Sequence, residues 1–240
     1  MQICNPSSSS LSRVKPQDLR IPYCFADRYP VLLQGVFFLP DHYYEHEKYG
    51  LESWYPFYKH YKKIYIEYCS GNGTWILEKA KQDPSILWIA VERRWDRARK
   101  IWVKKENYKI DNCLIVYGNA EAFSQYYLQK GLINAIFVNF PDPWPKEKHA
   151  KNRLFQAPFI GSLNESLKPC CAISVVTDDP VFKTQIVDQF ALSDAWINPH
   201  LPRGYLDELD GYGSSFFEEL WRSKGLGIHY MQFFKKEGAQ

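Results

Sequence analysis

A stiff loop follows one of the buried strands that the sequence predicts. The apolar run VNF gives way to PDPWPK, so that Asp142 stands between two prolines and Lys146 follows closely. Proline has no backbone N–H and a restricted φ angle, so this stretch has to leave the sheet as a rigid loop. A carboxylate held in this way can accept hydrogen bonds from a ligand and stabilise positive charge that develops on it. The alternative is a structural turn with a solvated Asp142, and Trp144 is either a base-stacking residue or loop core.

A second candidate site is the turn EYCSGNG, in which Glu67 ends a strand and Gly71 and Gly73 precede a helix. Glycines there permit positive φ and close approach of a ligand, and the helix N-terminus adds unpaired N–H groups. Glu92 ends the next strand, 21 residues after Gly71, where an acid can accept hydrogen bonds from both hydroxyls of a ribose. Cys69 stands in place of the first glycine of G-x-G-x-x-G. Together these residues favour nucleoside binding over a plain tight turn.

The third strand ends in YGNAEAF, which places Asn119 at the same rim of the sheet. Its amide oxygen can accept a hydrogen bond from the exocyclic amine of an adenine. Asn is also among the best helix N-cap residues, and the sequence does not separate the two roles.

Two basic segments lie beside these strand ends. Residues 146–153, KEKHAKNR, carry four Lys or Arg against one Glu, and residues 93–105 carry seven against Asp96, so their net charges are +3 and +6. On a helix the second segment has a basic stripe and an opposite apolar face. The stripe comprises Arg93, Arg97, Lys100 and Lys104, and the apolar face comprises Trp95, Ala98 and Trp102. We expect RNA contact for 146–153, whereas the stripe is either a phosphate-binding surface or a solvated helix face.

These residues need a scaffold, and the sequence indicates alternating strands and helices from residue 63 onward. Strands are predicted at 63–69, 86–92, 112–118, 133–140 and 171–177, with a late strand at 227–234 that suits an antiparallel edge. Helices are predicted at 74–82, 95–106, 120–130, within 152–167, and at 180–190. This alternation is typical of a mainly parallel α/β sheet covered by helices. In such sheets ligands bind at the carboxyl ends of the strands.

The composition agrees with a large cytosolic domain. The 240 residues are 45% hydrophobic and 17% aromatic, which is enough for a sizeable core. We find no apolar run long enough for a membrane span and no apolar leader, so we expect no membrane and a cytoplasmic location. The six cysteines lack C-x-x-C spacing and are expected to be reduced thiols without zinc or another metal. The sequence does not distinguish a monomer from a homodimer.

The chain divides into three expected parts. Residues 1–16 are polar and predict a flexible tail, and residues 17–60 predict an irregular, partly helical N-terminal segment. Residues 61–240 form the expected α/β domain.

Taken together, E-x-x-x-G-x-G, the acid after the second strand, G-N-A and N-F-P-D-P-W-P-K resemble the class I S-adenosylmethionine-dependent methyltransferases. More narrowly, residues 60–236 resemble the bacterial tRNA (guanine-N7)-methyltransferase family, most specifically in NFPDPWPK and the basic segment after it. The resemblance implies a Rossmann-like, mainly parallel seven-stranded sheet with helices on both faces. Three positions depart from the family pattern, because Cys69 replaces a glycine, Asn119 an aspartate and Ser215 a threonine.

The resemblance also implies roles for individual residues. Asp142 is the implied catalytic residue, and the implied S-adenosylmethionine contacts are Glu67, Gly71, Gly73, Glu92, Asn119 and Asp142. The implied RNA contacts are Lys146, Lys148, His149, Lys151, Asn152, Arg153, Asp178, Ser215, Phe216, Phe217 and Glu218.

The implied reaction is methyl transfer to N7 of a variable-loop guanosine in tRNA. N7 has an exposed lone pair, so positioning and charge stabilisation suffice and no strong base is required. One alternative is methylation of another nucleophile, although the N-P-P-[YFW] loop typical of adenine amino methylation is absent. The other is a non-catalytic RNA-binding protein on a methyltransferase scaffold, for which Cys69 and Asn119 are the support.

Overall fold

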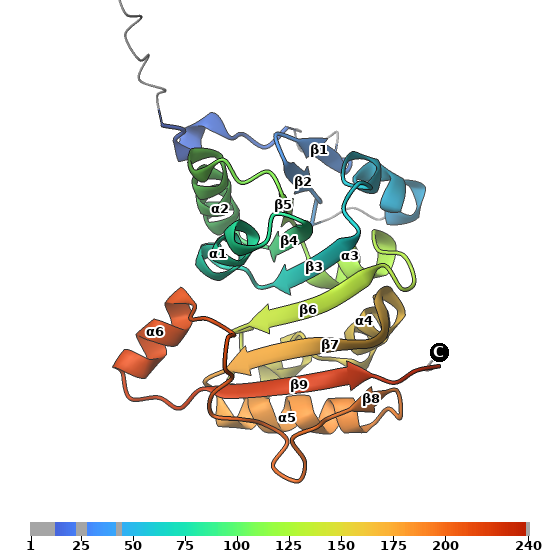
Figure 1. Cartoon of the computed structure of the whole chain (residues 1–240), viewed down its shortest axis with the longest axis vertical. Helices are drawn as coiled ribbons and strands as arrows, with labels where there is room; N and C mark the ends of the chain where they lie inside the picture. The colour runs from blue at the N-terminus through green and yellow to red at the C-terminus, as the bar shows by residue number, and fades with distance from the viewer. Residues whose placement is uncertain (1–12, 23–27, 42–44, 239–240) are drawn as a thin grey trace, which may run out of the picture.

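The computed structural model describes residues 13–22, 28–41 and 45–238. Most of the predicted flexible tail lies outside these residues. The described chain forms one nine-stranded sheet with the order β1-β2-β5-β4-β3-β6-β7-β9-β8, with helices on both faces (Figure 1). The strands are β1 Val31–Leu33, β2 Val36–Phe38, β3 Lys63–Tyr68, β4 Ile86–Glu92, β5 Cys113–Tyr117, β6 Ile133–Asn139, β7 Leu167–Thr177, β8 Trp196–Ile197 and β9 His229–Lys235.

The six strands predicted by range are present as β3, β4, β5, β6, β7 and β9, and the sheet also contains β1, β2 and β8. Strands β2 to β7 pair in parallel, whereas β9 is antiparallel to β7, as expected for the late strand. It is not the edge, because the two-residue β8 pairs with it. The other edge is the β1–β2 hairpin, which lies in the segment that the sequence indicated as irregular.

The hairpin escaped sequence analysis because its strands have three residues each, too few for a periodic pattern. Its turn residues Gln34 and Gly35 both have positive φ, 51° and 71°, as two-residue hairpins with a type I′ turn require. Every residue of β2 is buried, and Val36 pairs with Ile115 of β5. The described residues of the N-terminal segment also include the 3-10 turns η1 Pro16–Asp18, η2 His46–Lys48, η3 Leu51–Ser53 and η4 Tyr55–Phe57, which agrees with the partly helical expectation.

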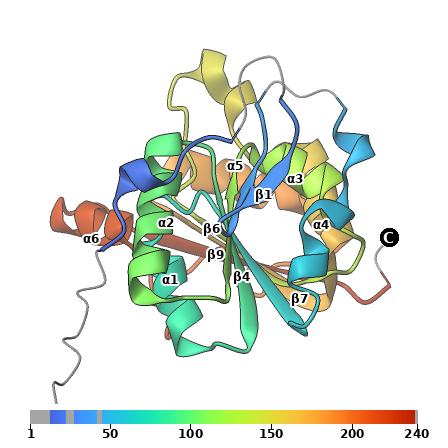
Figure 2. The same ribbon diagram turned by 90° about the horizontal axis from the view of Figure 1, so that it is seen from above.

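The helices form two layers that bury two separate cores. Helices α1 Thr74–Gln82 and α2 Trp95–Tyr108 lie on one face of the sheet, and α3 Ala120–Tyr126, α4 Ala157–Ser166 and α5 Pro180–Ala191 lie on the other (Figure 2). The first core joins Ile76 and Ile101 to Ala90 of β4. The second joins Phe123 and Phe159 to Ile66 of β3. Each helix thus turns its apolar stripe to the sheet, which is the pattern that the sequence periodicity predicted.

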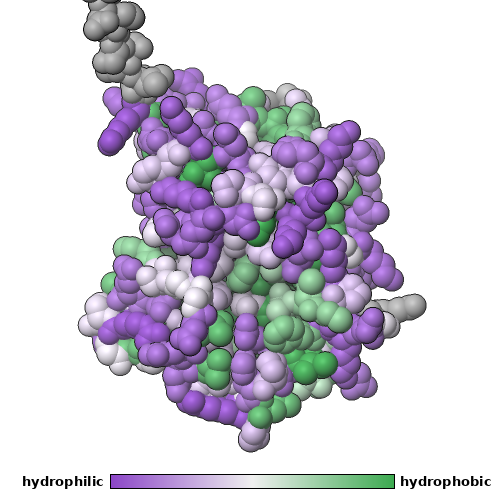
Figure 3. All heavy atoms as spheres, in the orientation of Figure 1, coloured by the Kyte–Doolittle hydropathy of each residue, from purple (hydrophilic) through white to green (hydrophobic). Residues whose placement is uncertain are grey.

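One half of the α1–α2 face is open. A row of paired residues, Tyr65, Ala135, Ala172 and Phe234, crosses β3, β6, β7 and β9 and is only half-buried. Hydrophobic residues accordingly gather on the surface over β7 and β9 (Figure 3). In the described part of the chain no helix is long and apolar enough to cross a membrane.

The topology fixes where a ligand can bind. The chain passes from β3 through β4 to β5 on one side, and then returns to place β6 on the other side of β3. The carboxyl ends of β3 and β6 therefore flank the point where the strand order reverses, which is the usual ligand site of open parallel sheets. Helix α6 Phe216–Ser223 lies beside these strand ends (Figure 1).

Candidate active site

A cavity of about 580 Å³ opens at the carboxyl ends of β3, β4, β5, β6 and β7. Its lining includes Cys69, Glu92, Asn119, Asp142 and Asp178. These residues come from five separate strand ends, so the sheet brings together groups that are far apart in the sequence. The volume is in the range of small-molecule sites, about 300–1,000 Å³.

Glu92 lies at the floor of this cavity and is almost completely buried. Its two carboxylate oxygens accept hydrogen bonds from the backbone N–H groups of Gly71 at 2.7 Å and of Arg94 at 2.8 Å. Burial raises the pKa of the Glu92 carboxyl, while these hydrogen bonds and the charge of Arg97 act in the opposite direction. Glu92 thereby ties the glycine turn to the end of β4, and each oxygen keeps a lone pair for a ligand hydroxyl.

Glu67 ends β3 next to the cavity and is 1% exposed. Its Oε1 accepts a hydrogen bond from Asn139 Nδ2 at 2.6 Å, while its Oε2 is buried and has no hydrogen-bond partner among the described residues. Ser70 Oγ donates to the backbone carbonyl of Glu67 at 2.9 Å and not to the carboxylate. Burial, only partly offset by the hydrogen bond from Asn139, raises the pKa of Glu67 to about 7. A buried carboxylate oxygen without a partner is a strong acceptor for a ligand donor.

The glycine turn needs its glycines, and Cys69 shares their backbone conformation. Gly71 and Gly73 have φ of 57° and 69°, and a Cβ on Gly73 would lie 2.8 Å from side-chain atoms of Ile101. Cys69 has φ of 60°, a left-handed conformation that glycine adopts without strain. The family glycine at this position is therefore explained by backbone geometry, and Cys69 carries strain of about 1–3 kcal/mol in its place.

Asn119 acts as the N-cap of α3. Its Oδ1 accepts a hydrogen bond from the N–H of Ala122 at 3.0 Å, which is the capping role that the sequence left as one of two readings. The residue also lines the cavity, so the contact with an adenine that the sequence suggested stays a prediction.

The PDPWP loop is stiff, and more than its prolines stiffen it. Phe140 and Trp144 at its two ends have positive φ, 50° and 43°. Asp142 Oδ1 accepts a hydrogen bond from the N–H of Trp144 at 3.1 Å, and Arg153 Nε donates to the carbonyl of Pro143 at 2.8 Å. Asp142 is exposed and faces the cavity. The ring of the half-buried Trp144 lies 5.8 Å from that of His149.

The basic segment after the loop forms the 3-10 helix η5 Glu147–Asn152. Lys146, Lys148, Lys151 and Asn152 are exposed, and Asn152 lines the mouth of the cavity. Arg153 corrects the sequence expectation of an RNA contact, because it is buried and its guanidinium bonds to the PDPWP backbone and to Gln185. Its charge supports the loop rather than facing solvent.

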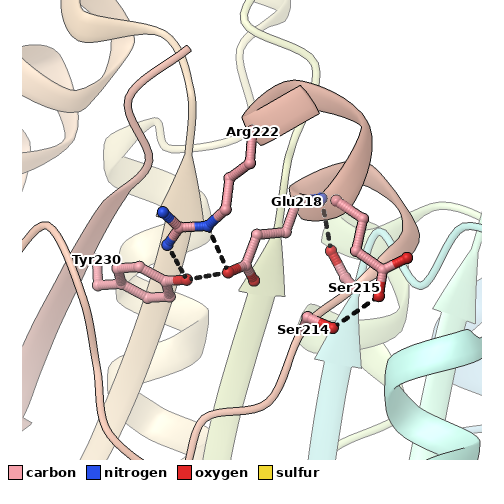
Figure 4. A network of polar contacts seen from close by, with 6 residues as sticks. Ser214, Ser215, Glu218, Arg222 and Tyr230 are labelled. Carbon is pink, nitrogen blue, oxygen red and sulfur yellow. Dashed lines mark hydrogen bonds and ion pairs between the residues drawn. The ribbon is translucent and has the colours of Figure 1, made fainter. Parts of the chain in front are cut away.

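Helix α6 begins at SSFF, and most of its candidate residues bind within the protein. Ser215 Oγ accepts a hydrogen bond from the N–H of Glu218 at 3.2 Å, as a helix N-cap. The buried Glu218 accepts from Tyr230 at 2.6 Å and from Arg222 at 3.1 Å (Figure 4). Phe216 is 48% exposed, and it is the exposed residue among the candidates in α6. The candidate RNA residues of this segment therefore separate into structural and accessible ones.

Phe217 separates the main cavity from a smaller one. A Cβ on Gly71 would lie 3.3 Å from its ring, and the guanidinium of Arg97 lies 5.2 Å from the ring centroid. Arg97 therefore lies in the cavity, while Lys104 of the same predicted stripe turns inward. Lys104 Nζ donates to the carbonyl of Asn72 at 2.9 Å and to Thr74 at 3.0 Å. The predicted basic stripe is therefore not one surface, because Arg97 lines the cavity and Lys104 bonds to the glycine turn.

Sequence analysis missed two residues of this region. Asn139 bridges β6 to β3, and Tyr212 donates to Asn139 Oδ1 at 2.7 Å. Asn139 had a signal, because a polar residue in an apolar run directly before PDPWP needs a partner. Tyr212 had none, since it lies in a polar loop 73 residues away from its partner.

The described residues hold no metal cluster, and their cysteines are unpaired. Among the described residues no group of three or more His, Cys, Asp or Glu side chains is arranged to hold a metal ion. Cys69, Cys113, Cys170 and Cys171 are free thiols, and Cys4 and Cys24 lie outside the described residues.

Comparison with known proteins identifies the family. The family model described as "Putative methyltransferase" matches residues 61–231. The chain belongs to this methyltransferase family. A similar protein of Chlamydia pneumoniae, named tRNA (guanine-N(7)-)-methyltransferase, is 42% identical over 226 residues, which is 94% of this chain and 100% of that protein. A protein of the same name from Leptospira interrogans is 29% identical over 73% of this chain and 80% of its own length.

Solved structures agree with this methyltransferase fold. The 16S rRNA methyltransferase KamB superposes with a TM-score of 0.57 at 15% identity, covering 78% of this chain and 94% of that one. The antibiotic-resistance methyltransferase Kmr superposes with a TM-score of 0.53 at 16% identity, covering 78% and 93%. The Rossmann-like class I fold expected from the resemblance is confirmed, with two strands more than the expected seven.

Proposed function

We propose that this methyltransferase transfers a methyl group from S-adenosylmethionine to N7 of a variable-loop guanosine in tRNA, in the cytoplasm. The observation that carries the proposal is the placement of Asp142 at the same cavity as Glu92, beside the exposed lysines of η5. Relatives that are 40–42% identical over 94% of the chain carry the name of this activity.

The residues present fit the cofactor. Glu92 would accept hydrogen bonds from the ribose hydroxyls, and the Asn119 amide, which also lines the cavity, would meet the adenine. Glu67, with one unpartnered buried oxygen, would face the amino-acid end. Gly71 and Gly73 keep the turn short enough for a ligand to pass close to the backbone.

The proposed reaction requires no strong acid or base from the protein, because N7 already has a free lone pair. When bound, S-adenosylmethionine supplies a methyl group on a positively charged sulfur, and the bonding electron pair returns to sulfur as the N7 lone pair forms the new C–N bond. Positive charge therefore moves toward the guanine. Asp142, fixed by the Trp144 N–H and the prolines, would accept hydrogen bonds from the base and favour that charge. The stiff loop contributes because it holds the carboxylate in place before the base arrives.

RNA would approach across the exposed side of the cavity. Lys146, Lys148 and Lys151 are exposed next to the PDPWP loop, and Arg93 and Arg94 are exposed across the cavity from them. Such cations bind phosphates without reading sequence. N7 lies in the deep, narrow groove of A-form RNA, so a loop or a tertiary junction presents it better than a regular helix. The other candidate residues with accessible surface would contact the target nucleotide, and these are His149, Asn152, Asp178, Phe216 and Phe217.

A nucleoside-resolved methylation assay tests the proposal. The protein is incubated with methyl-labelled S-adenosylmethionine and unmodified tRNA, and the RNA is then digested to nucleosides. Label in 7-methylguanosine is expected, and it should disappear when the variable-loop guanosine is replaced by adenosine. Label in another nucleoside would favour the alternative methyltransferase reading. Cofactor binding without any transfer would favour a non-catalytic RNA-binding protein.

A further inference from the structure

A buried chain of hydrogen bonds connects the loop before α6 to the acid at the end of β3. Tyr212 donates its O–H to Asn139 Oδ1 at 2.7 Å, and Asn139 Nδ2 donates to Glu67 Oε1 at 2.6 Å. The exposed fractions are 7% for Tyr212, 4% for Asn139 and 1% for Glu67. Water is therefore largely excluded from the chain, so each group depends on the next for its hydrogen bond.

When Glu67 is ionised, the chain has one chemically sensible direction. A carboxylate accepts hydrogen bonds only, so the amide that faces Glu67 must present its NH₂ group. The amide oxygen of Asn139 then faces Tyr212, whose hydroxyl is able to donate. Tyr212 thus selects the orientation of the Asn139 amide that serves Glu67. Without the hydroxyl the amide could turn and place its oxygen against the carboxylate.

The free end of the chain points to a small cavity. Glu67 Oε2 is buried and unpartnered among the described residues, and Glu67 lines a cavity of about 20 Å³ together with Ser70, Asn72 and Thr74. That volume accommodates a single small polar group, since one water needs about 10–15 Å³ on this scale. The cavity lies on the far side of Phe217 from the ribose acid Glu92. A ligand that contacts both Glu92 and the small cavity needs a nucleoside at one end and a small hydrogen-bond donor at the other.

We propose that Tyr212 and Asn139 are positioning residues that hold the Glu67 carboxylate for the α-ammonium group of the cofactor. Asn139 occupies one carboxylate oxygen, so the other is directed at the ligand. The inference rests on S-adenosylmethionine as the cofactor within the proposed function, and it is independent of which RNA atom is methylated.

Tyr212 is also attached to the segment that leads into α6. Its carbonyl accepts a hydrogen bond from Trp75 Nε1 at 2.8 Å, and Ser215 caps α6 three residues later. A displacement of α6 would therefore pull on the same hydrogen-bond chain. The amino-acid end of the cofactor is the part whose affinity should respond to events at α6.

The test compares two ligands that share the nucleoside and differ at the amino-acid end. S-adenosylhomocysteine carries the amino acid, whereas 5′-methylthioadenosine lacks it. Calorimetry on the Tyr212→Phe variant should show a Kd for S-adenosylhomocysteine about five- to tenfold higher, as expected for one lost hydrogen bond. The Kd for 5′-methylthioadenosine should stay within about twofold of the parent value.

Tyr68→Phe is the matched control. It removes another buried hydroxyl, bound to Ser124 at 2.6 Å, on the opposite face of β3. The ratio of the two Kd values should be unchanged in this variant. A purely structural role for Tyr212 predicts equal weakening of both ligands, and that result, or an unchanged ratio, would overturn the proposal.

A second variant separates the positioning role from a loss of folding. Glu67→Gln should itself raise the Kd for S-adenosylhomocysteine, and adding Tyr212→Phe to it should cost less than about twofold more, because both act through one contact. Full additivity would overturn the proposal. No RNA is present in these experiments, so a wrong assignment of the methylated atom does not change their outcome. Failure of the parent protein to bind either ligand would reject the cofactor and with it the proposed function.

Discussion

The two sides of the cavity are built differently. On the side proposed for the cofactor, Glu92 lines the cavity and Glu67 lies next to it; both are buried, and protein donors already hold three of their four carboxylate oxygens. On the side proposed for RNA, the lysines of η5 are exposed. A small cofactor binds best in a preformed pocket from which water is excluded. A large polyanion such as RNA is bound by exposed positive charges. Asp142 lies between them, since it is exposed yet faces the cavity.

Asp142→Ala should produce the largest effect because it removes the group that belongs to both sides. We expect kcat to fall by about a hundredfold to a thousandfold, as for loss of one group that stabilises transition-state charge. The Kd values for S-adenosylhomocysteine and for tRNA should change by less than about threefold. Single-turnover kinetics and calorimetry measure these quantities. A variant with near-normal turnover would show that Asp142 is only a structural residue of the loop.

Glu67→Gln should change the pH dependence of the free energy of unfolding. This tests whether the Glu67 carboxyl is shielded from water. The pKa of Glu67 is raised by burial from 4.5 to about 7. Because its carboxyl pKa is higher in the folded state, protonation of Glu67 stabilises the folded protein. This stabilisation is fully present below about pH 4.5 and is lost as the pH rises to about 7. The loss amounts to about 3 kcal/mol.

The variant should lack this loss, so its free energy of unfolding relative to the parent should rise between pH 4.5 and 7 and then stay constant. Denaturant unfolding across that range measures the difference. The titratable groups that interact electrostatically with Glu67 are Glu92, Cys69, Cys113 and Tyr212, and they are the same in both proteins. Parallel curves would mean that the Glu67 carboxyl is solvated in the free protein.

Glu92→Gln should weaken cofactor binding by about ten- to a hundredfold, because hydrogen bonds to a charged group are lost. Unlike Tyr212→Phe, it should weaken S-adenosylhomocysteine and 5′-methylthioadenosine equally, since both contain the ribose. Calorimetry with the two ligands measures this. Selective loss of one ligand would place Glu92 away from the ribose.

Charge reversal of Lys148 and Lys151 should give the smallest effect, about tenfold on tRNA affinity, with a salt dependence of log K that is flatter by about two. Reversal of Lys62 and Lys63 is the matched control, since both are exposed and lie where β3 begins, at the opposite rim of the sheet. Filter binding over a salt series compares them. Equal effects of the two pairs would mean that net charge, rather than the η5 surface, attracts the RNA.

The sequence by itself determined the parts that depend on local pattern. The predicted helix at 74–82 is α1 with the same bounds, and the alternation of strands and helices from residue 63 is confirmed. The carboxylates at strand ends could be placed at one rim because parallel strands share their carboxyl edge. Hydrophobic periodicity and turn residues act between neighbours in the chain, so they are visible without a structure.

Only the tertiary structure decided which charged groups face a ligand and which face the protein. Arg153 was expected to contact RNA, and Lys104 belonged to a stripe that was either phosphate-binding or solvated. In the structure Arg153 bonds to the PDPWP loop and Lys104 bonds to the glycine turn. Tyr212 and Glu67 meet through Asn139 across more than 70 residues on each link. Such choices depend on which side chains become close neighbours after the sheet has closed, and neither periodicity nor composition carries that information.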